Sequence, residues 1–119
     1  MRVIIAGGRN FDDYEKVRTT LNDIINDKKM IITEILSGHA KGADSLGEHY
    51  AETNDIKLAM YPADWDLHGK SAGHIRNDAM SKDADMLIAF WDGKSKGTAN
   101  MINRALKREL FVKIVRYKE

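Results

Sequence analysis

The residues best suited to bind a phosphate group lie in short glycine-rich stretches of this 119-residue chain. Two glycines precede an arginine at 7–9, and Gly38 and Gly42 flank a second polar turn. Residues 69–73 and 93–98 each hold two glycines with lysine and serine between them. Glycine lets a phosphate approach backbone N–H groups closely, and arginine offers a fork of N–H donors. These four stretches are therefore the candidate anion-binding segments.

None of these stretches is a standard nucleotide-binding motif. The triplet GKS at 69–71 and at 93–95 resembles the end of a Walker A loop, but Asp64 and Ile88 stand where that loop requires its first glycine. No G-x-G-x-x-G follows the first apolar segment, and no G-x-S-x-G is present. The sequence therefore indicates an anion site that is neither a P-loop, nor a dinucleotide fingerprint, nor a nucleophile elbow.

Composition limits the classes of protein to which the chain can belong. With 43% hydrophobic and 31% charged residues, its length fits one soluble domain with a single core. No apolar run approaches the ~20 residues of a membrane span, and glycine follows the first apolar segment too early for a signal peptide, which predicts a cytoplasmic protein without membrane contact. The absence of cysteine excludes thiolate chemistry. His39, Asp44 and His49 are not spaced to converge on one ion, so we expect no metal site and no cofactor.

Short apolar segments alternate with longer segments of helical periodicity. The predicted strands are 2–6, 31–36, 57–61, 85–91 and 111–115, and the predicted helices are 13–28, 43–54, 71–83 and 97–109. At the start of the first helix, Asp12 and Glu15 have the spacing of a capping box. Because strands that alternate with helices form βαβ units, we expect one three-layer α/β domain over residues 1–119, with a five-stranded, mainly parallel sheet.

Most of the glycine-rich stretches follow a predicted strand and precede a predicted helix. In a parallel sheet such turns lie at the carboxyl edge, where α/β proteins bind their ligands. Each turn ends at a helix N-terminus, whose free N–H groups and dipole favour an anion. We therefore expect the four stretches to contribute to one site at this edge.

Four ordered motifs give the chain a resemblance to a known family. They are AGGRNF (6–11), SGHAKGAD (37–44), W-x-x-x-G-K-S-A-G-H-I-R-N-D-A-M (65–80) and AFWDGKSKGTANM (89–101). In order and spacing they resemble the YspA-like branch of the SLOG superfamily, which is related to the LOG-type phosphoribohydrolases and the Smf/DprA domain. The resemblance implies a Rossmann-like fold with strand order 3-2-1-4-5 and a homodimer or homotetramer. It also implies a pocket for a nucleotide-derived small molecule between loops 7–11 and 92–98.

The resemblance assigns roles within the fourth motif. LOG-type enzymes bind phosphate through the glycines and threonine of P-G-G-x-G-T-x-x-E and use its glutamate in glycosidic chemistry. Gly93, Gly97 and Thr98 match this frame, although the proline is replaced and the glycines are further apart. Asn100 and Met101 stand where the acid is expected. The resemblance therefore implies a phosphate cradle without its usual carboxylate.

The third motif is similar to the H-x-R-K-x-x-M segment of the same enzymes. His74, Arg76 and Met80 match it, and Asn77 replaces the lysine. By this resemblance Arg76 is the candidate catalytic arginine, and it is also a candidate anchor for the ligand.

A glycosidase would need another carboxylate near the anomeric carbon, because an amide at position 100 cannot act as a base. Asp92, at the end of the fourth predicted strand, is the preferred catalytic candidate because it has no evident capping role. Asp44 and Asp64 are alternatives. Asp44 has a second interpretation, since an aspartate in a first helical turn stabilises the N–H groups there.

Several of the expected contacts have structural alternatives. Arg9 and Arg76 would bind phosphate or remain surface charges, and Phe11 and Trp65 would stack on a base or pack against the protein. The expected ligand-binding residues are Gly7, Gly8, Arg9, Phe11, Ser37, Gly38, Gly42, Asp44, Trp65, Gly73, His74, Arg76, Asn77, Asp92, Gly93, Ser95, Gly97 and Thr98.

Three classes of function fit these observations. The first is a binding module that senses or sequesters a nucleotide-derived signal similar to ADP-ribose or a cyclic nucleotide, and the associations of the family would suit a phage-encoded protein. The second is an enzyme that hydrolyses the N-glycosidic bond of a nucleoside monophosphate. The third is a single-stranded DNA-binding domain, which the formal charge of +1 and the lack of an aromatic and basic platform disfavour. The missing glutamate makes the binding module the leading hypothesis.

Overall fold

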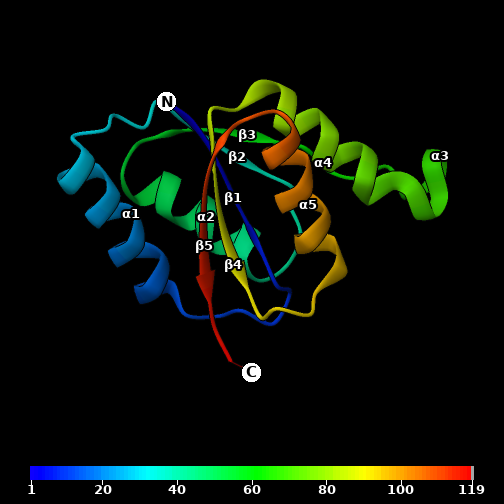
Figure 1. The fold of residues 1–119 in the computed structure, drawn as a ribbon, viewed down its shortest axis with the longest axis horizontal. Coiled ribbons are helices and arrows are strands. Elements are labelled where there is room, and N and C mark those ends of the chain that lie inside the picture. Colours follow the sequence, from blue (N-terminus) through cyan, green and yellow to red (C-terminus); the bar gives the residue numbers. More distant parts are fainter. Residues whose placement is uncertain (119) are drawn as a thin grey trace.

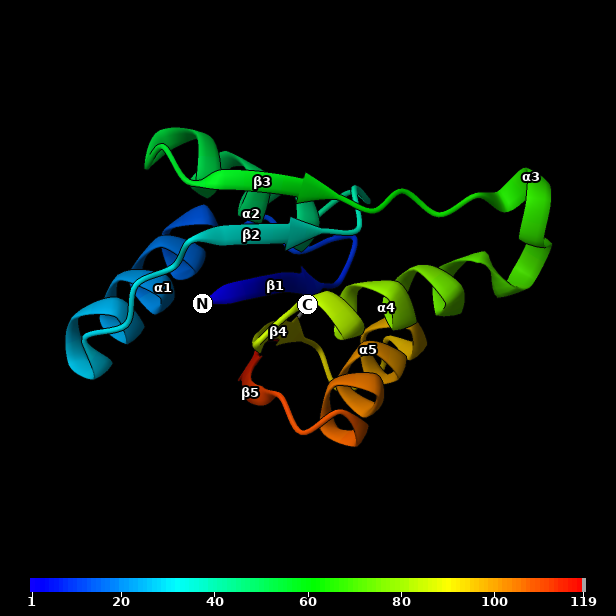
Figure 2. The ribbon, with the colours of Figure 1, turned by 90° about the horizontal axis from the view of Figure 1, so that it is seen from above.

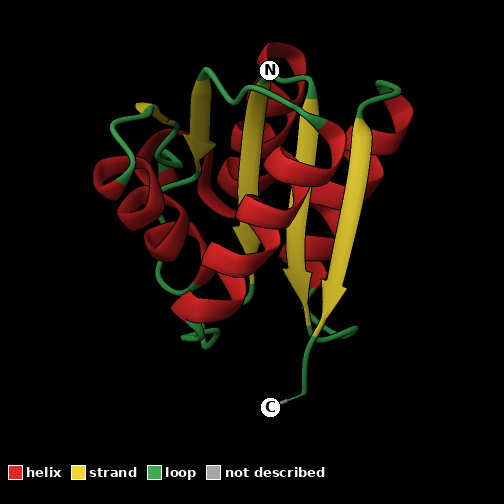
Figure 3. Ribbon diagram, turned by 90° about the vertical axis from the view of Figure 1, so that its left-hand side faces the viewer, coloured by secondary structure: helices red, strands yellow, loops and turns green. Residues whose placement is uncertain are grey.

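Five parallel strands form the centre of the computed structural model, which describes residues 1–118 (Figure 3). They are β1 (Arg2–Gly7), β2 (Glu34–Ser37), β3 (Lys57–Met60), β4 (Met86–Trp91) and β5 (Phe111–Arg116). Their order in the sheet is β3-β2-β1-β4-β5, and all four neighbouring pairs are parallel. This confirms the predicted Rossmann-like fold and strand order.

Helices cover both faces of the sheet, as Figures 1 and 2 show. They are α1 (Tyr14–Lys28), α2 (Ala43–Thr53), α3 (Trp65–His68), the 3-10 helix η1 (Gly69–Ser71), α4 (Ala72–Asp83) and α5 (Lys96–Lys107). The first two lie on one face, and α4 and α5 lie on the other. Within residues 1–118 no helix combines the length and the apolar character needed to cross a membrane.

Alternating side chains of the central strands build two apolar cores. In β1, Val3 and Ile5 pack toward α1 and α2, whereas Ile4 and Ala6 pack toward α4 and α5. This alternation follows from the two-residue period of a strand whose two faces are both buried. The carboxyl ends of the central strands are therefore held rigidly at one edge of the sheet.

Two local predictions differ from the structure. The second strand begins at Glu34, not at residue 31, because Ile31 is exposed and Thr33 donates its N–H to the carbonyl of Met1. Asp13, not Asp12, caps α1, since its carboxylate accepts the N–H of Lys16 at 3.0 Å. Neither difference changes the order of the elements.

The connection from β3 to α4 contains an arm that the sequence did not predict. Helix α3 and the 3-10 helix η1 project away from the sheet (Figure 2), and the main contacts of α3 are with η1 and α4. Asp64 begins this arm by accepting the N–H of Leu67 at 3.0 Å. That capping contact gives Asp64 a structural role.

Candidate functional site

A cavity of about 460 Å³ lies at the carboxyl end of the sheet, beside the neighbouring strands β1 and β4. Strand order reverses here, because β2 and β3 extend from β1 on one side and β5 extends from β4 on the other. The walls come from the turn after β1, the start of α2, the arm with α4, and the turn that leads from β4 into α5.

Most of the expected site residues come together around this cavity. They are Gly7, Gly8, Arg9, Asp44, Trp65, Gly73, His74, Arg76, Asn77, Asp92, Ser95, Gly97 and Thr98. The four glycine-rich stretches, which lie far apart in the sequence, therefore contribute to one concave surface.

The turn after β1 is held by close backbone contacts. Gly8 donates its N–H to the carbonyl of Phe90 at 3.1 Å and accepts the N–H of Ala43 at 3.2 Å. A Cβ at Gly7 would collide with the carbonyl oxygen of Phe90, and one at Gly42 would collide with that of Gly8. These two glycines allow the turn, β4 and the start of α2 to approach one another.

Arg9 extends from this tightly held turn, and no described residue forms a hydrogen bond or ion pair with its guanidinium. The residue is exposed and lines the cavity. Its guanidinium is therefore available to an anion in the cavity.

Arg76, on α4, is held in place by neutral groups. Its Nη1 donates to the carbonyl of Gly38 at 2.6 Å and its Nε donates to Oδ1 of Asn77 at 3.0 Å. Burial lowers the pKa of Arg76, the charge of Asp44 opposes this shift, and the charge of Arg9 adds to it. Arg76 is thus a partly buried cation with a second positive charge, that of Arg9, nearby. Two such cations favour the binding of an anion.

Asp44 is the buried carboxylate of the site. Its Oδ2 accepts the N–H of Ala40 at 3.2 Å, so it stabilises the turn that precedes α2. Burial raises the pKa of Asp44 to about 6, although the Ala40 N–H and the charge of Arg76 act in the opposite direction. This carboxyl therefore titrates close to neutral pH.

Asp92 has a structural role in the β4–α5 turn that the sequence did not reveal. Its Oδ1 accepts the N–H groups of Lys94 and Ser95, each at 2.8 Å. These hydrogen bonds, with that from Ser95 the stronger cause, lower the pKa of Asp92. The expectation that Asp92 is free of structural duty is wrong, and at neutral pH it is an ionised carboxylate that fixes the β4–α5 turn.

The N-terminus of α5 forms the opposite wall of the cavity. Ser95 caps the helix, since its Oγ accepts the N–H of Thr98 at 3.4 Å and lies 3.1 Å from the Thr98 hydroxyl. A Cβ at Gly97 would meet no atom within 4 Å. The backbone of the first turn of α5 at Gly97 therefore faces an open space, and the buried Thr98 lines the cavity beside it.

Asn77 and Asn100 form an amide pair beneath this wall. Nδ2 of Asn77 donates to Oδ1 of Asn100 at 3.0 Å and to the carbonyl of Gly97 at 3.3 Å. Asn77 is buried and lines the cavity, whereas Asn100 does not reach its lining. Two of the positions that depart from the LOG-type motifs thus contact each other as neutral groups.

Five expected residues lie outside the lining of the main cavity: Phe11, Ser37, Gly38, Gly42 and Gly93. The ring of Phe11 lies between Phe90 and Tyr117, with centroid distances of 4.9 and 4.7 Å, so its faces are occupied by protein. Ser37 is buried and donates its hydroxyl to Glu48 at 2.7 Å. These residues support the turns around the cavity.

The other glycines in this set act through the backbone. Gly42 and Gly93 have positive φ angles of 78° and 85°, and a Cβ at Gly93 would collide with Arg116. Gly38 lies against Arg76, and it lines a second cavity of about 340 Å³. That cavity shares Arg9, Ala40, Trp65 and Arg76 with the main one.

The structure also adds lining residues that were not among the candidates: Ala6, Asn10, Ala40, Lys70, Met80 and Met101. Lys70 belongs to the GKS triplet at 69–71, which is not a Walker motif. Its position in the third glycine-rich stretch was the sequence feature from which its place in the site could have been predicted. Met80 and Met101 are almost fully buried. They form the apolar floor.

Comparison with known proteins places the chain in a family. The chain belongs to the YspA, cpYpsA-related SLOG family, whose model matches residues 1–68, from β1 through α3. It is also similar to the Gene 61 protein of Mycobacterium phage D29, with 33% identity over 112 residues that cover 89% of each protein. The resemblance drawn from the four motifs is thereby confirmed at the level of the family.

Proposed function

We propose that this domain binds a nucleotide or nucleotide-derived ligand, similar to ADP-ribose or to a cyclic nucleotide, and acts as a sensor or a sequestering protein. The observation that carries the proposal is the pair Arg9 and Arg76. Both line one cavity, neither forms an ion pair within residues 1–118, and the charge of Arg9 lowers the pKa of Arg76. An anionic group between them would relieve the repulsion of the two cations.

The remaining lining suits a nucleotide. The start of α5 offers backbone N–H groups and the hydroxyl of Thr98 to a phosphate. Trp65, which is 52% exposed, offers a ring face on which a base can stack. Because Arg9 and Arg76 line both the main cavity and the 340 Å³ cavity, a ligand with its phosphates at the arginines has room for a group on either side.

The polar chemistry favours binding over hydrolysis. Asp92 uses one carboxylate oxygen to hold the turn, and its lowered pKa makes it a weak base at neutral pH. Asn100 has an amide where LOG-type enzymes have a catalytic carboxylate, and this amide accepts a hydrogen bond from Asn77. The relative from phage D29 supports only the proposal that the protein is phage-encoded.

An N-glycosidic hydrolase is the second candidate, because one carboxyl in the cavity has suitable acid–base properties. Asp44 lines the cavity, and its pKa of about 6 suits proton transfer near neutral pH. Release of free base from nucleoside monophosphates, abolished by Asp44→Asn and retained in Asp92→Asn, would support this activity. Absence of any base from a nucleotide panel would exclude it for those substrates.

The binding proposal is tested by identifying what the purified protein carries. Heat denaturation followed by mass spectrometry of the supernatant should release a nucleotide-derived molecule in an amount related to that of the protein. Calorimetry with mononucleotides, dinucleotides, cyclic nucleotides and ADP-ribose should then detect binding. If no nucleotide is released and calorimetry detects no binding across this panel, the proposal is wrong.

A further inference from the structure

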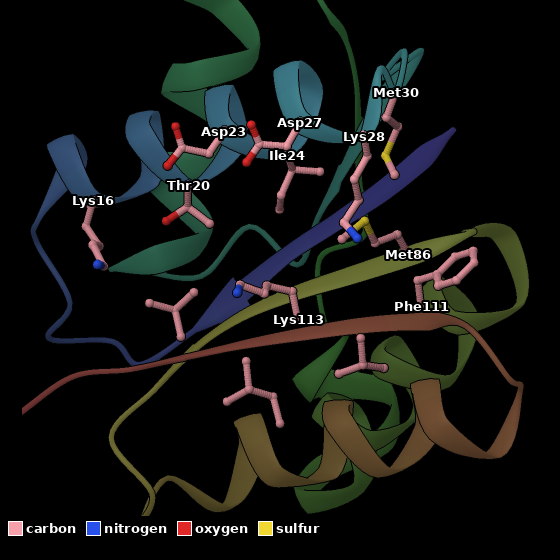
Figure 4. A pocket seen from close by; sticks show the side chains of 13 residues that line it. Lys16, Thr20, Asp23, Ile24, Asp27, Lys28, Met30, Met86, Phe111 and Lys113 are labelled. Carbon is pink, nitrogen blue, oxygen red and sulfur yellow. The ribbon is translucent and has the colours of Figure 1, made fainter.

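A second concave surface lies between α1 and β5, away from the candidate ligand site. This α1–β5 groove, of about 710 Å³, is bordered by α1 over residues 16–28 and by β5 over residues 111–115, and Figure 4 shows its side chains. Ile24, Met30 and Met86 contribute apolar surface to it. It shares no lining residue with the main cavity.

β5 is the open edge of the sheet on this side. Among the described strands it pairs only with β4, so the backbone groups of its other edge meet no strand. Phe111 is 67% exposed and Ile114 is 40% exposed, although both belong to a six-residue strand that contains no proline. Such an edge is a template for a further strand.

Helix α1 carries an ordered stripe of charge beside this edge. Lys16, Thr20, Asp23 and Asp27 lie along the groove at helical spacing, with Lys16 near the N-terminus of α1 and the two acidic groups toward its C-terminus. Lys28 also lines the groove in the last turn, where its side chain points toward Met86 (Figure 4). Within residues 1–118 none of Lys16, Asp23 and Asp27 forms an ion pair. Lys16 and Asp27, near opposite ends of the stripe, are therefore complementary to Asp27 and Lys16 of an antiparallel copy.

We propose that a second copy of this chain occupies the groove. In the resulting dimer, the two β5 strands pair antiparallel across a two-fold axis perpendicular to the sheet, and the two α1 helices run antiparallel above them. The same two-fold axis places Lys16 of each copy opposite Asp27 of the other. The antiparallel pairing of the β5 strands and the antiparallel arrangement of the α1 helices both require a rotation of one copy by half a turn. The exposed side chains of β5 become covered, and the dimer contains one continuous ten-stranded sheet.

Lys113 restricts the register of the strand pair. If the axis passed through Lys113, two lysines would lie directly opposite each other, which is unfavourable. An axis at Val112 or at Ile114 keeps the side-chain faces matched and separates the two lysines. The dimer is therefore expected to use one of these two registers.

Analytical ultracentrifugation from roughly 1 to 200 µM tests the proposal with a charge exchange. The wild-type protein should self-associate as a dimer. Lys16→Asp and Asp27→Lys should each raise the dimer dissociation constant roughly tenfold or more, because each change converts two attractive pairs into repulsive ones. The double variant Lys16→Asp/Asp27→Lys should recover much of the lost affinity.

Asn26→Lys is the matched control, since residue 26 is exposed on α1 but does not line the groove. It should leave the dissociation constant unchanged, and circular dichroism should report the same helix content in all variants. A protein that stays monomeric over the whole range would overturn the proposal, and Lys113 would then act as a charge that protects the edge. A dimer that is insensitive to both single changes, or not restored by the double change, would also overturn it.

Discussion

The two arginines of the candidate site differ in what orients them. Arg76 is fixed through Gly38 and Asn77, whereas Arg9 extends from a rigid turn with no protein partner within residues 1–118. A fixed guanidinium loses little side-chain entropy when an anion binds, and a free one gains its first partner. Arg76 therefore supplies geometry and Arg9 supplies additional charge.

We expect Arg9→Ala and Arg76→Ala each to weaken binding of the identified nucleotide by roughly 10- to 100-fold, because each removes a hydrogen bond between charged groups. Isothermal titration calorimetry measures this change. Arg18→Ala is the control, since Arg18 pairs with Glu15 on α1 and does not line the cavity. Unchanged affinity in both site variants would remove the arginines from the site.

A pH-dependent stability follows from Asp44. Because burial raises the pKa of its carboxyl to about 6 from 3.8, the folded protein binds this proton more tightly than the unfolded chain. Its contribution to stability is therefore complete below about pH 4 and is lost as the pH rises through about 6. The difference is on the order of 2–3 kcal/mol.

Asp44→Asn removes this titration while keeping an oxygen that can accept the N–H of Ala40. Relative to this variant, the wild-type free energy of unfolding should fall between pH 4 and pH 7, as measured by urea denaturation. A constant difference over this range would contradict the assignment.

Among the secondary-structure elements, the glycines of the strand-to-helix turns have different roles. Gly7 and Gly42 permit backbone segments to meet, so a side chain at either position disturbs packing. Gly97, in contrast, leaves open space beside the first turn of α5. Glycine thus permits close backbone packing at positions 7 and 42, and at position 97 it leaves the helix N-terminus accessible.

This difference predicts opposite outcomes for two substitutions. Gly97→Val should fold with a melting temperature close to that of the wild type but weaken nucleotide binding by roughly tenfold or more, because the added side chain enters the space where a phosphate would approach. Gly7→Ala should lower the melting temperature, since its Cβ collides with Phe90. Calorimetry and thermal denaturation together test the pair. Full nucleotide affinity in Gly97→Val would place the ligand elsewhere.

At the scale of the whole molecule, the ligand site and the α1–β5 groove occupy separate regions. The cavity lies where β1 and β4 end, and the groove lies along α1 and the outer strand β5. The helices over the two faces hold the sheet between them (Figure 1). We therefore expect substitutions to alter the proposed nucleotide binding and the proposed self-association independently.

The sequence by itself determined the fold and the edge at which the site lies. Hydrophobic periodicity is a local property, and strands that alternate with helices allow few topologies, so the parallel sheet was predictable. Its strand order was implied by the resemblance of the four motifs to the family. The glycine-rich turns marked the carboxyl edge for the same reason, and their motifs indicated the family that the comparisons confirm.

Only the tertiary structure decided which side chains face the cavity. Phe11 is withdrawn because Phe90 and Tyr117, distant in sequence, cover its ring, and Asp92 is engaged because the following turn folds back onto its carboxylate. The arm that carries Trp65 and Lys70 lacked a sufficiently long periodic pattern to be predicted. The direction and solvation of a side chain depend on packing between remote segments, which no local pattern encodes.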